Sequence, residues 1–155
     1  MIKILLATLA IILTTNSIAQ DTIQNHNYIC IGTGAFFNSP MKDWKQLLGA
    51  SIEYGRYFKS GMSVGVNFGY WSLLKGSEYN GVKITYPLLS NDYYAFSMSG
   101  GVNYFYTYKE LLFEYDFNTS IFLKNDYSLS LSYCFQSGLG YDRAQSFNIG
   151  VNKDF

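Results

Sequence analysis

Residues 61–71 read GMSVGVNFGYW, and this stretch decides the fold. Bulky apolar residues occupy every second position from Met62 to Tyr70, and serine, glycine and asparagine lie between them. Alternation with a period of two predicts a β-strand with two unlike faces. A water-soluble sheet and a membrane barrel can both alternate in this way, but they turn opposite faces toward water. The rest of the sequence has to decide which face looks where.

The same alternation recurs along the chain and predicts further strands of similar length. The predicted strands cover residues 28–37, 47–58, 62–73, 81–89, 93–106, 110–122, 127–136 and 145–155. Most have about the 9–11 residues that a tilted strand needs to cross a bilayer. Tight connections at residues 59–61, 90–92 and 124–126 alternate with connections that are longer on average, and the tight ones consist of Lys, Ser, Gly, Asn and Asp. This order predicts an all-β, eight-stranded, up-and-down antiparallel barrel with its short turns at one end.

The two faces of these strands differ strongly in bulk. One face collects valine, leucine, isoleucine, phenylalanine and tyrosine, and the other collects serine, glycine and asparagine. The lumen of an eight-stranded barrel is only just wide enough for side chains to fill it, so this many large residues predict an apolar face turned toward lipid. Charged residues make up only 14% of the chain, against about 25% in soluble domains. A soluble lipocalin-like barrel with an apolar cavity is the alternative, and the near-neutral charge gives no case for nucleic acid.

The N-terminal residues predict export. Lys3 is followed by an uncharged apolar run over residues 4–13 and by the small-residue sequence Ser17-Ile18-Ala19. These are the parts of a cleaved signal peptide, and the apolar run is too short to span a bilayer as a helix. The predicted organisation is a signal peptide at 1–19, a polar periplasmic leader at 20–27 and a barrel domain at 28–155.

The chain resembles the small eight-stranded outer-membrane β-barrel proteins of Gram-negative bacteria. The signal peptide, the alternating strands and the terminal FNIGVNKDF, which ends at Phe155, carry this resemblance. It implies a transmembrane barrel in the outer membrane, with the lipid bilayer and the outer-membrane assembly machinery as partners and Phe155 as the signal that this machinery reads. Lys153 departs from the family pattern, in which the last strand usually has an apolar outward residue there, but near the periplasmic rim its side chain could snorkel.

Catalytic and metal-binding residues are sparse. Some barrels of this type are lipid-modifying enzymes that use serine, histidine and an acid, but the only histidine, His26, precedes the first strand and falls on the periplasmic side. A triad needs its members in mutual contact, so we expect no catalytic residues. One histidine and the separated Cys30 and Cys134 predict no metal site and no cofactor. The strand order keeps the cysteines too far apart to bridge, which predicts two free, buried thiols.

A few charged residues fall on the inward face of the predicted strands. Because a buried charge without a partner is costly, we expect them to form a lumen charge network. Counting from the long-loop end places Lys83 and Glu114 at similar heights, which predicts a direct pair. Arg56 falls on the lipid face, so either it snorkels or Gly55 marks a bulge that turns it inward. The predicted network comprises Glu53, Lys83, Glu114 and Asp116.

The predicted long loops carry cations and aromatic residues that could hold the phosphates of lipopolysaccharide. They are Lys42, Trp44, Lys45, Lys75, Lys109, Tyr141 and Arg143. Acidic residues stand beside them, so an ordinary solvated rim is the alternative. The expected function is a structural or interaction role through extracellular loops. A barrel that binds or transports a small solute or hydrophobic ligand is the first alternative, and a lipid-modifying enzyme is the second.

Overall fold

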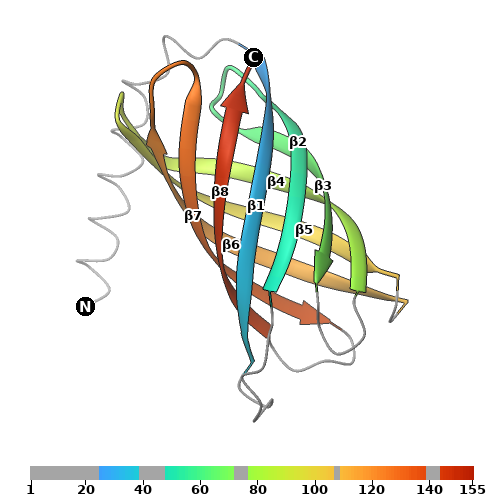
Figure 1. Cartoon of the computed structure of the whole chain (residues 1–155). Helices are drawn as coiled ribbons and strands as arrows, with labels where there is room; N and C mark the ends of the chain where they lie inside the picture. The colour runs from blue at the N-terminus through green and yellow to red at the C-terminus, as the bar shows by residue number, and fades with distance from the viewer. Residues whose placement is uncertain (1–24, 39–47, 72–76, 107–108, 139–143) are drawn as a thin grey trace, which may run out of the picture.

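The computed structural model describes residues 25–38, 48–71, 77–106, 109–138 and 144–155. None of these residues forms a helix long and apolar enough to cross a membrane. The strands are β1 (His26–Asn38), β2 (Leu48–Tyr57), β3 (Ser63–Trp71), β4 (Ser77–Ser90), β5 (Tyr94–Phe105), β6 (Glu110–Phe122), β7 (Tyr127–Gly138) and β8 (Ala144–Asp154). Each strand pairs antiparallel with the next, and β8 pairs with β1 to close the barrel (Figure 1). The predicted all-β, up-and-down barrel of eight strands is confirmed.

The two ends of the barrel differ in their connections. The tight turns lie at the end that also holds the C-terminus, uppermost in Figure 1, and we call it the turn end. The backbone φ is 79° at Gly61 and 62° at both Asn125 and Asp126, which glycine, asparagine and aspartate tolerate best. The side chain of Asn91 accepts a hydrogen bond of 2.8 Å from the backbone N–H of Tyr93. We call the opposite end, where the remaining connections join the strands, the loop end.

The strands are inclined to the barrel axis. Pairing partners followed around the barrel from Tyr28, through Lys83 and Glu114, return to β1 at Asn38, ten residues beyond the start. Such a stagger accompanies strand tilt in every closed barrel. A row of paired residues therefore climbs from the turn end toward the loop end as it passes from β1 to β8. Two residues in one row but on different strands lie at different heights.

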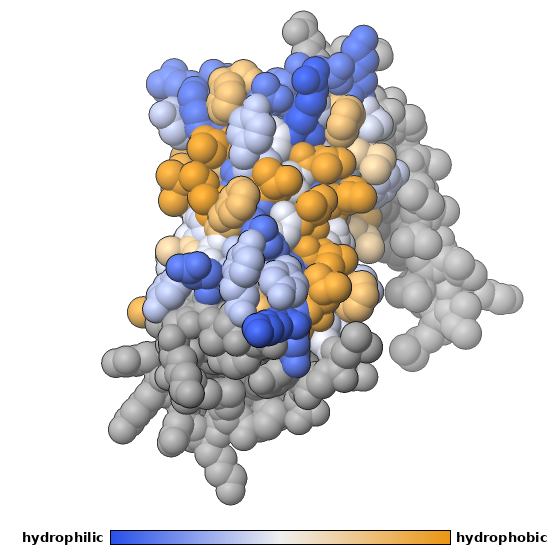
Figure 2. All heavy atoms as spheres, turned by 90° about the vertical axis from the view of Figure 1, so that its right-hand side faces the viewer, coloured by the Kyte–Doolittle hydropathy of each residue, from blue (hydrophilic) through white to orange (hydrophobic). Residues whose placement is uncertain are grey.

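The apolar face of the strands looks outward. In the stretch from Gly61 to Trp71, Phe68 is 54% exposed whereas the neighbouring Asn67 is 6% exposed. Figure 2 shows an apolar belt across the middle of the face in view, with hydrophilic residues bordering it toward the turn end. The apolar side chains of such a belt can contact the hydrocarbon core of a bilayer. The closed barrel also satisfies its strand hydrogen bonds there, which an open sheet edge could not do. The predicted orientation of the two faces is confirmed.

Some aromatic rings nevertheless point inward, which corrects the expectation that the interior holds only small and polar residues. Tyr28, Tyr79 and Phe105 are 4%, 7% and 3% exposed. Glycines make room for two of these rings. A Cβ on Gly55 would lie 2.4 Å from the Tyr28 ring, and a Cβ on Gly69 would lie 2.3 Å from the Tyr79 ring. A large ring on one strand thus lies beside a glycine on the neighbouring strand. Large and small residues therefore alternate between strands as well as along each strand.

The pairing register is irregular at one place among the described strands, and it is not Gly55. The β4–β5 register shifts between Pro87 and Leu89, so Leu88 falls at the irregularity. Proline cannot donate to the strand ladder, which explains a bulge there. The registers of β2 with β1 and β3 run unbroken through Gly55, and Arg56 is exposed on the outward side near the turn end. Of the two readings of Arg56, the structure supports snorkelling.

Strand ends agree with the prediction to within two residues except at the start of β4. This strand begins at Ser77 rather than at residue 81. Tyr79 and Asn80 therefore belong to the barrel wall, and Lys83 lies deeper in the lumen than its predicted place near the strand start. The prediction began the strand at residue 81 and left these residues in the preceding connection. The pair Asn80-Gly81 is common in turns, which favours a boundary at that point.

Candidate functional site

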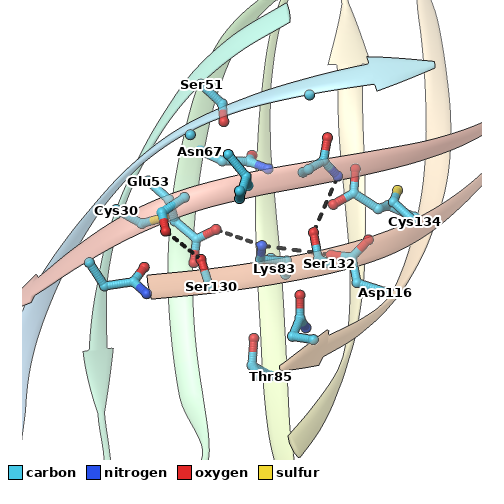
Figure 3. Close-up of a pocket in the computed structure, with 18 of the residues that line it drawn as sticks. Cys30, Ser51, Glu53, Asn67, Lys83, Thr85, Asp116, Ser130, Ser132 and Cys134 are labelled. Carbon is cyan, nitrogen blue, oxygen red and sulfur yellow. Dashed lines mark hydrogen bonds and ion pairs between the residues drawn. The ribbon is translucent and has the colours of Figure 1, made fainter. Parts of the chain in front are cut away.

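A cluster of charged side chains crosses the middle of the lumen. Lys83 Nζ, from β4, lies 2.7 Å from Glu53 Oε2 on β2 and 3.7 Å from Asp116 Oδ2 on β6 (Figure 3). The side chains of Lys83, Glu53 and Asp116 are 18%, 11% and 3% exposed. Because β2 and β6 lie on opposite sides of an eight-stranded ring, Lys83 links two facing walls of the barrel.

The direct pair expected between Lys83 and Glu114 is not the one that forms. The two residues share a row, with Gly101 between them on β5. A row climbs ten residues over eight strands, hence two to three residues over two strands, so Glu114 lies closer to the loop end than Lys83 does. The same offset brings Asp116 on β6 and Glu53 on β2 to the height of Lys83. The predicted pair was wrong because residue counts from the rim give equal heights only for strands that are not tilted.

Amide side chains hold Glu114 instead. Asn103 Nδ2 donates to Glu114 Oε2 at 2.6 Å, and Gln136 Nε2 donates to the same oxygen at 2.9 Å. All three residues are buried. The carboxylate of Glu114 thus links β5, β6 and β7 inside the lumen, through charge-assisted hydrogen bonds.

Small polar side chains connect neighbouring strands elsewhere on the inner wall. These contacts satisfy polar groups that would otherwise be costly to bury. They include Thr85 Oγ1 with Ser99 Oγ at 2.9 Å, Asn118 Nδ2 to Ser99 Oγ at 2.7 Å, Asn148 Nδ2 to Ser132 Oγ at 3.3 Å, and Asn152 Nδ2 to Ser128 Oγ at 3.0 Å.

Aromatic rings narrow the lumen near the turn end. Tyr28 donates from its hydroxyl to Glu53 Oε1 at 2.5 Å, and its ring lies 4.7 Å from that of Tyr57. The His26 ring lies 4.9 Å from the Tyr57 ring in a tilted arrangement, and His26 Nε2 lies 3.6 Å from Asp154 Oδ2. The group therefore joins the ends of β1, β2 and β8 and connects them to the charged cluster.

A second aromatic pair lies toward the loop end. The rings of Tyr79 and Phe105 stack at 5.0 Å, between β4 and β5. A cavity of about 120 Å³ is lined by Tyr28, Tyr57 and Tyr79 together with the charged cluster and many serines and glycines. This volume is polar and large enough for several water molecules.

The lumen also contains a cluster that the sequence had not revealed. Cys134 on β7 lies directly opposite Asp116 on β6, and each of Glu114, Asp116 and Cys134 offers an atom within 4.8 Å of the other two. Sequence reasoning had treated Cys134 as an isolated thiol, although strand alternation already placed all three on the inward face. Both cysteines are free, as predicted, but only Cys134 is fully buried and Cys30 is half-buried.

Three buried oxygen atoms within the described residues have no hydrogen-bond partner. They are Asn67 Oδ1, Asn103 Oδ1 and Asp116 Oδ1. A buried acceptor left unpaired carries a desolvation penalty of about 1–3 kcal/mol. The unpaired atom of Asp116 is the notable one, because it belongs to the carboxylate beside Cys134.

The other predicted site residues are placed as follows. Lys42, Trp44, Lys45, Lys75, Tyr141 and Arg143 lie outside the described residues. Lys109 is exposed at the loop end, with a backbone φ of 56°, just before β6. Phe155 is 61% exposed and exchanges two backbone hydrogen bonds with Asn27, of 2.9 and 3.0 Å. Its part in assembly stays a prediction.

Lys153, which departs from the family pattern, makes several stabilising contacts at the turn end. Its Nζ donates to the backbone oxygen of Asn125 at 2.7 Å and lies 3.5 Å from Asp126 Oδ2. The same nitrogen lies 4.6 Å from the centre of the Tyr127 ring, a cation–π contact. The cation thus reaches the aqueous rim rather than hydrocarbon.

Comparison with known proteins finds similarity in structure alone. No protein-family model matches the chain, and no curated protein is similar to it in sequence. The N-terminal β-barrel domain of Pseudomonas aeruginosa OprF is similar, with a TM-score of 0.65, 11% identity and coverage of 85% of this chain and 100% of that chain. Ail of Yersinia pestis has a TM-score of 0.58 and 13% identity, covering 85% and 100% of the two chains. The outer-membrane enzyme PagL has a TM-score of 0.59 and 14% identity, covering 81% and 98%.

The fold defines the chain as a small eight-stranded transmembrane β-barrel of the outer-membrane type. The resemblance predicted from the sequence is confirmed at the level of fold, and the neighbours support an outer-membrane location. They do not select a role, since PagL is an enzyme whereas the Neisserial surface protein NspA, with a TM-score of 0.56 and 10% identity, shares the same barrel. The role has to be argued from the lumen.

Proposed function

We propose that the chain is an outer-membrane protein with a closed lumen, and that it serves a structural or interaction role through the loop end, which faces the cell exterior. The observation that carries the proposal is the link from Glu53 through Lys83 to Asp116 across the barrel. A solute moving along the axis would have to separate buried opposite charges held at 2.7 Å. The rings of Tyr28 and Tyr79 narrow the path further. These features disfavour small-solute transport.

Planar-bilayer recording tests the closed lumen. The refolded barrel is expected to give no steady conductance. The double variant Glu53→Ala/Lys83→Ala removes the central link and should conduct, which shows that the assay registers an opened lumen. Steady conductance by the unaltered barrel would reject the closed lumen and favour the transport alternative.

We also propose that the barrel is not a lipid-modifying enzyme. The single histidine, His26, lies at the turn end, where its ring contacts that of Tyr57 and approaches Asp154. In the proposed orientation this is the periplasmic end, whereas a base acting on lipopolysaccharide is needed at the outer rim. Lipid A acyl chains should therefore be the same in cells that make the protein, cells that make His26→Ala and cells that make neither. Acyl chains altered by the unaltered protein but not by His26→Ala would establish the enzyme instead.

We further propose lipopolysaccharide phosphates as a partner of the loop end. Lys109, the described member of the predicted basic set, is exposed at that end, where a cation can meet head groups. Replacing Lys42, Lys45, Lys75, Lys109 and Arg143 with serine should weaken lipopolysaccharide binding. Replacing the adjacent acids Asp43, Glu78, Glu110 and Asp142 with serine is the matched control and should not weaken it. Unchanged binding in the first variant would reject lipopolysaccharide as a partner and support the alternative of an ordinary solvated rim.

A further inference from the structure

We propose that Glu114, Asp116 and Cys134 form a binding site inside the lumen for a thiophilic divalent metal ion of the zinc class. Each residue offers one ligand atom, and these atoms lie within 4.8 Å of one another. The three residues are 8%, 4% and 2% exposed. The set is therefore a compact, desolvated group of two carboxylates and a thiol rather than a solvated acidic patch.

The barrel wall holds these side chains in place. Asp116 and Cys134 are directly opposed in the β6–β7 ladder, and Glu114 lies two positions away on the same face of β6. Zinc bonds to sulfur and oxygen of about 2.0–2.3 Å in a tetrahedron place ligand atoms roughly 3.5 Å apart. The observed atoms thus need to close by at most roughly 1.3 Å, a distance within the reach of side-chain rotation.

The unpaired oxygen of Asp116 independently points to a ligand. Asp116 Oδ1 is buried and has no hydrogen-bond partner, although a buried carboxylate oxygen normally has one. The cluster also carries excess negative charge. Glu53 already lies 2.7 Å from Lys83, whereas Asp116 is 3.7 Å from the same ammonium. One ammonium cannot balance the carboxylates of Glu53, Asp116 and Glu114, so a divalent cation would both reduce the excess negative charge and give the unpaired oxygen a bond.

The donor atoms select the class of metal. Calcium and magnesium prefer oxygen ligands alone, whereas thiolate sulfur favours zinc and softer ions. Binding requires the Cys134 thiolate, so the thiol proton is released to solvent as the metal–sulfur bond forms. All three residues line the polar cavity, which leaves room for the ion and for water at a fourth coordination position. The rival explanation is that Glu114 and Asp116 share a proton instead of a metal.

Cadmium is a suitable probe because a cadmium–thiolate bond gives a charge-transfer absorption in the ultraviolet. Refolded barrel titrated with Cd²⁺ alone should show a band that saturates at one ion per barrel. Cys30→Ser is the matched control, since Cys30 is the other free thiol and lies on β1. It should keep the band, whereas Cys134→Ser should lose it. Cys134→Ser should also lower Zn²⁺ affinity by more than the ~10–100-fold that loss of an outer-sphere partner costs.

A second measurement avoids any dependence on the folding of Cys134→Ser. In the Cys30→Ser chain, Cys134 is the remaining thiol, and Zn²⁺ should slow its alkylation at least tenfold. Adding Glu114→Gln and Asp116→Asn should abolish this protection. Heat-modifiable gel migration confirms that each variant is folded. No saturable Cd²⁺ band, a band that survives Cys134→Ser, or no Zn²⁺ protection of Cys134 would overturn the metal site and leave the shared proton.

Discussion

Val82 and Lys83 are neighbours in β4, yet their surroundings differ completely. Val82 is 51% exposed on the outward face, where lipid accepts any apolar side chain. Lys83 points into the lumen and depends on particular carboxylate oxygens of Glu53 and Asp116. An outward position therefore requires only a hydrophobic side chain. An inward position requires particular partner side chains at the same height in the barrel. Substitutions on the two faces should therefore obey different rules.

The largest effect is expected from Lys83→Met. It leaves the buried carboxylates of Glu53 and Asp116 without their cation, which should lower the free energy of unfolding by about 3–5 kcal/mol. The matched control is Ile84→Met, the next residue on the outward face, which should cost less than about 1.5 kcal/mol because volume and polarity hardly change. Urea unfolding of barrels in lipid vesicles measures both. Equal losses of unfolding free energy in the two variants would show that the two faces do not differ in this way.

A charge placed on the outward face should have the next largest effect. Val82→Arg puts a cation into the apolar belt near the middle of β4 and should cost about 2–4 kcal/mol. Arg56 is the natural counterpart, since it faces outward near the turn end, and Arg56→Leu should change the unfolding free energy by at most about 1 kcal/mol. The same vesicle unfolding assay applies. A negligible cost for Val82→Arg would mean that this face does not meet hydrocarbon.

Glycines sharpen the comparison on a smaller scale. Gly69→Ala would place a Cβ 2.3 Å from the Tyr79 ring and should cost about 1–3 kcal/mol through overpacking. Gly100→Ala meets nothing within 4 Å on the outward side, so it should be neutral or stabilise by about 0.5–1 kcal/mol. Thermal or urea unfolding of the pair would distinguish these outcomes. A tolerated Gly69→Ala would show that the Tyr79 ring is not fixed inside.

The smallest change in stability is expected at the C-terminus. Phe155→Ala removes an exposed ring but keeps the backbone hydrogen bonds with Asn27, so unfolding should change by less than about 0.5 kcal/mol. If assembly machinery reads the terminal aromatic, the amount of folded barrel in outer membranes should nevertheless fall. Phe155→Tyr, which keeps an aromatic ring, should restore it. Equal membrane levels for all three chains would remove Phe155 from the assembly route.

The sequence predicts the outward face well and the inward partners poorly, for a physical reason. Alternation through Val66 and Phe68 suffices to orient a strand, since every outward position shares the same solvent. Tyr79 was missed because the strand start was misplaced at Asn80-Gly81. The partner of Lys83 was missed because its height relative to Glu114 depends on the tilt of the whole barrel, which emerges only when β8 closes on β1.

Cys134 illustrates the same limit from the side of chemistry. Its inward direction follows from alternation, but its position opposite Asp116 depends on the β6–β7 register. Register is set by the intervening turn, where Asn125 and Asp126 both adopt positive φ. A single residue more or less in that turn would move the thiol away from both carboxylates.

Double-mutant cycles on Lys83 test the central claim, a tilted barrel linked across its lumen, most directly. Lys83→Met is combined with Glu53→Gln in one cycle and with Glu114→Gln in another, and each chain is unfolded with urea in vesicles under metal-chelating conditions. We predict a coupling energy of about 1–3 kcal/mol for Lys83 with Glu53 and a clearly smaller one with Glu114. A larger coupling with Glu114 would contradict the tilt and the central link, and with them the closed lumen.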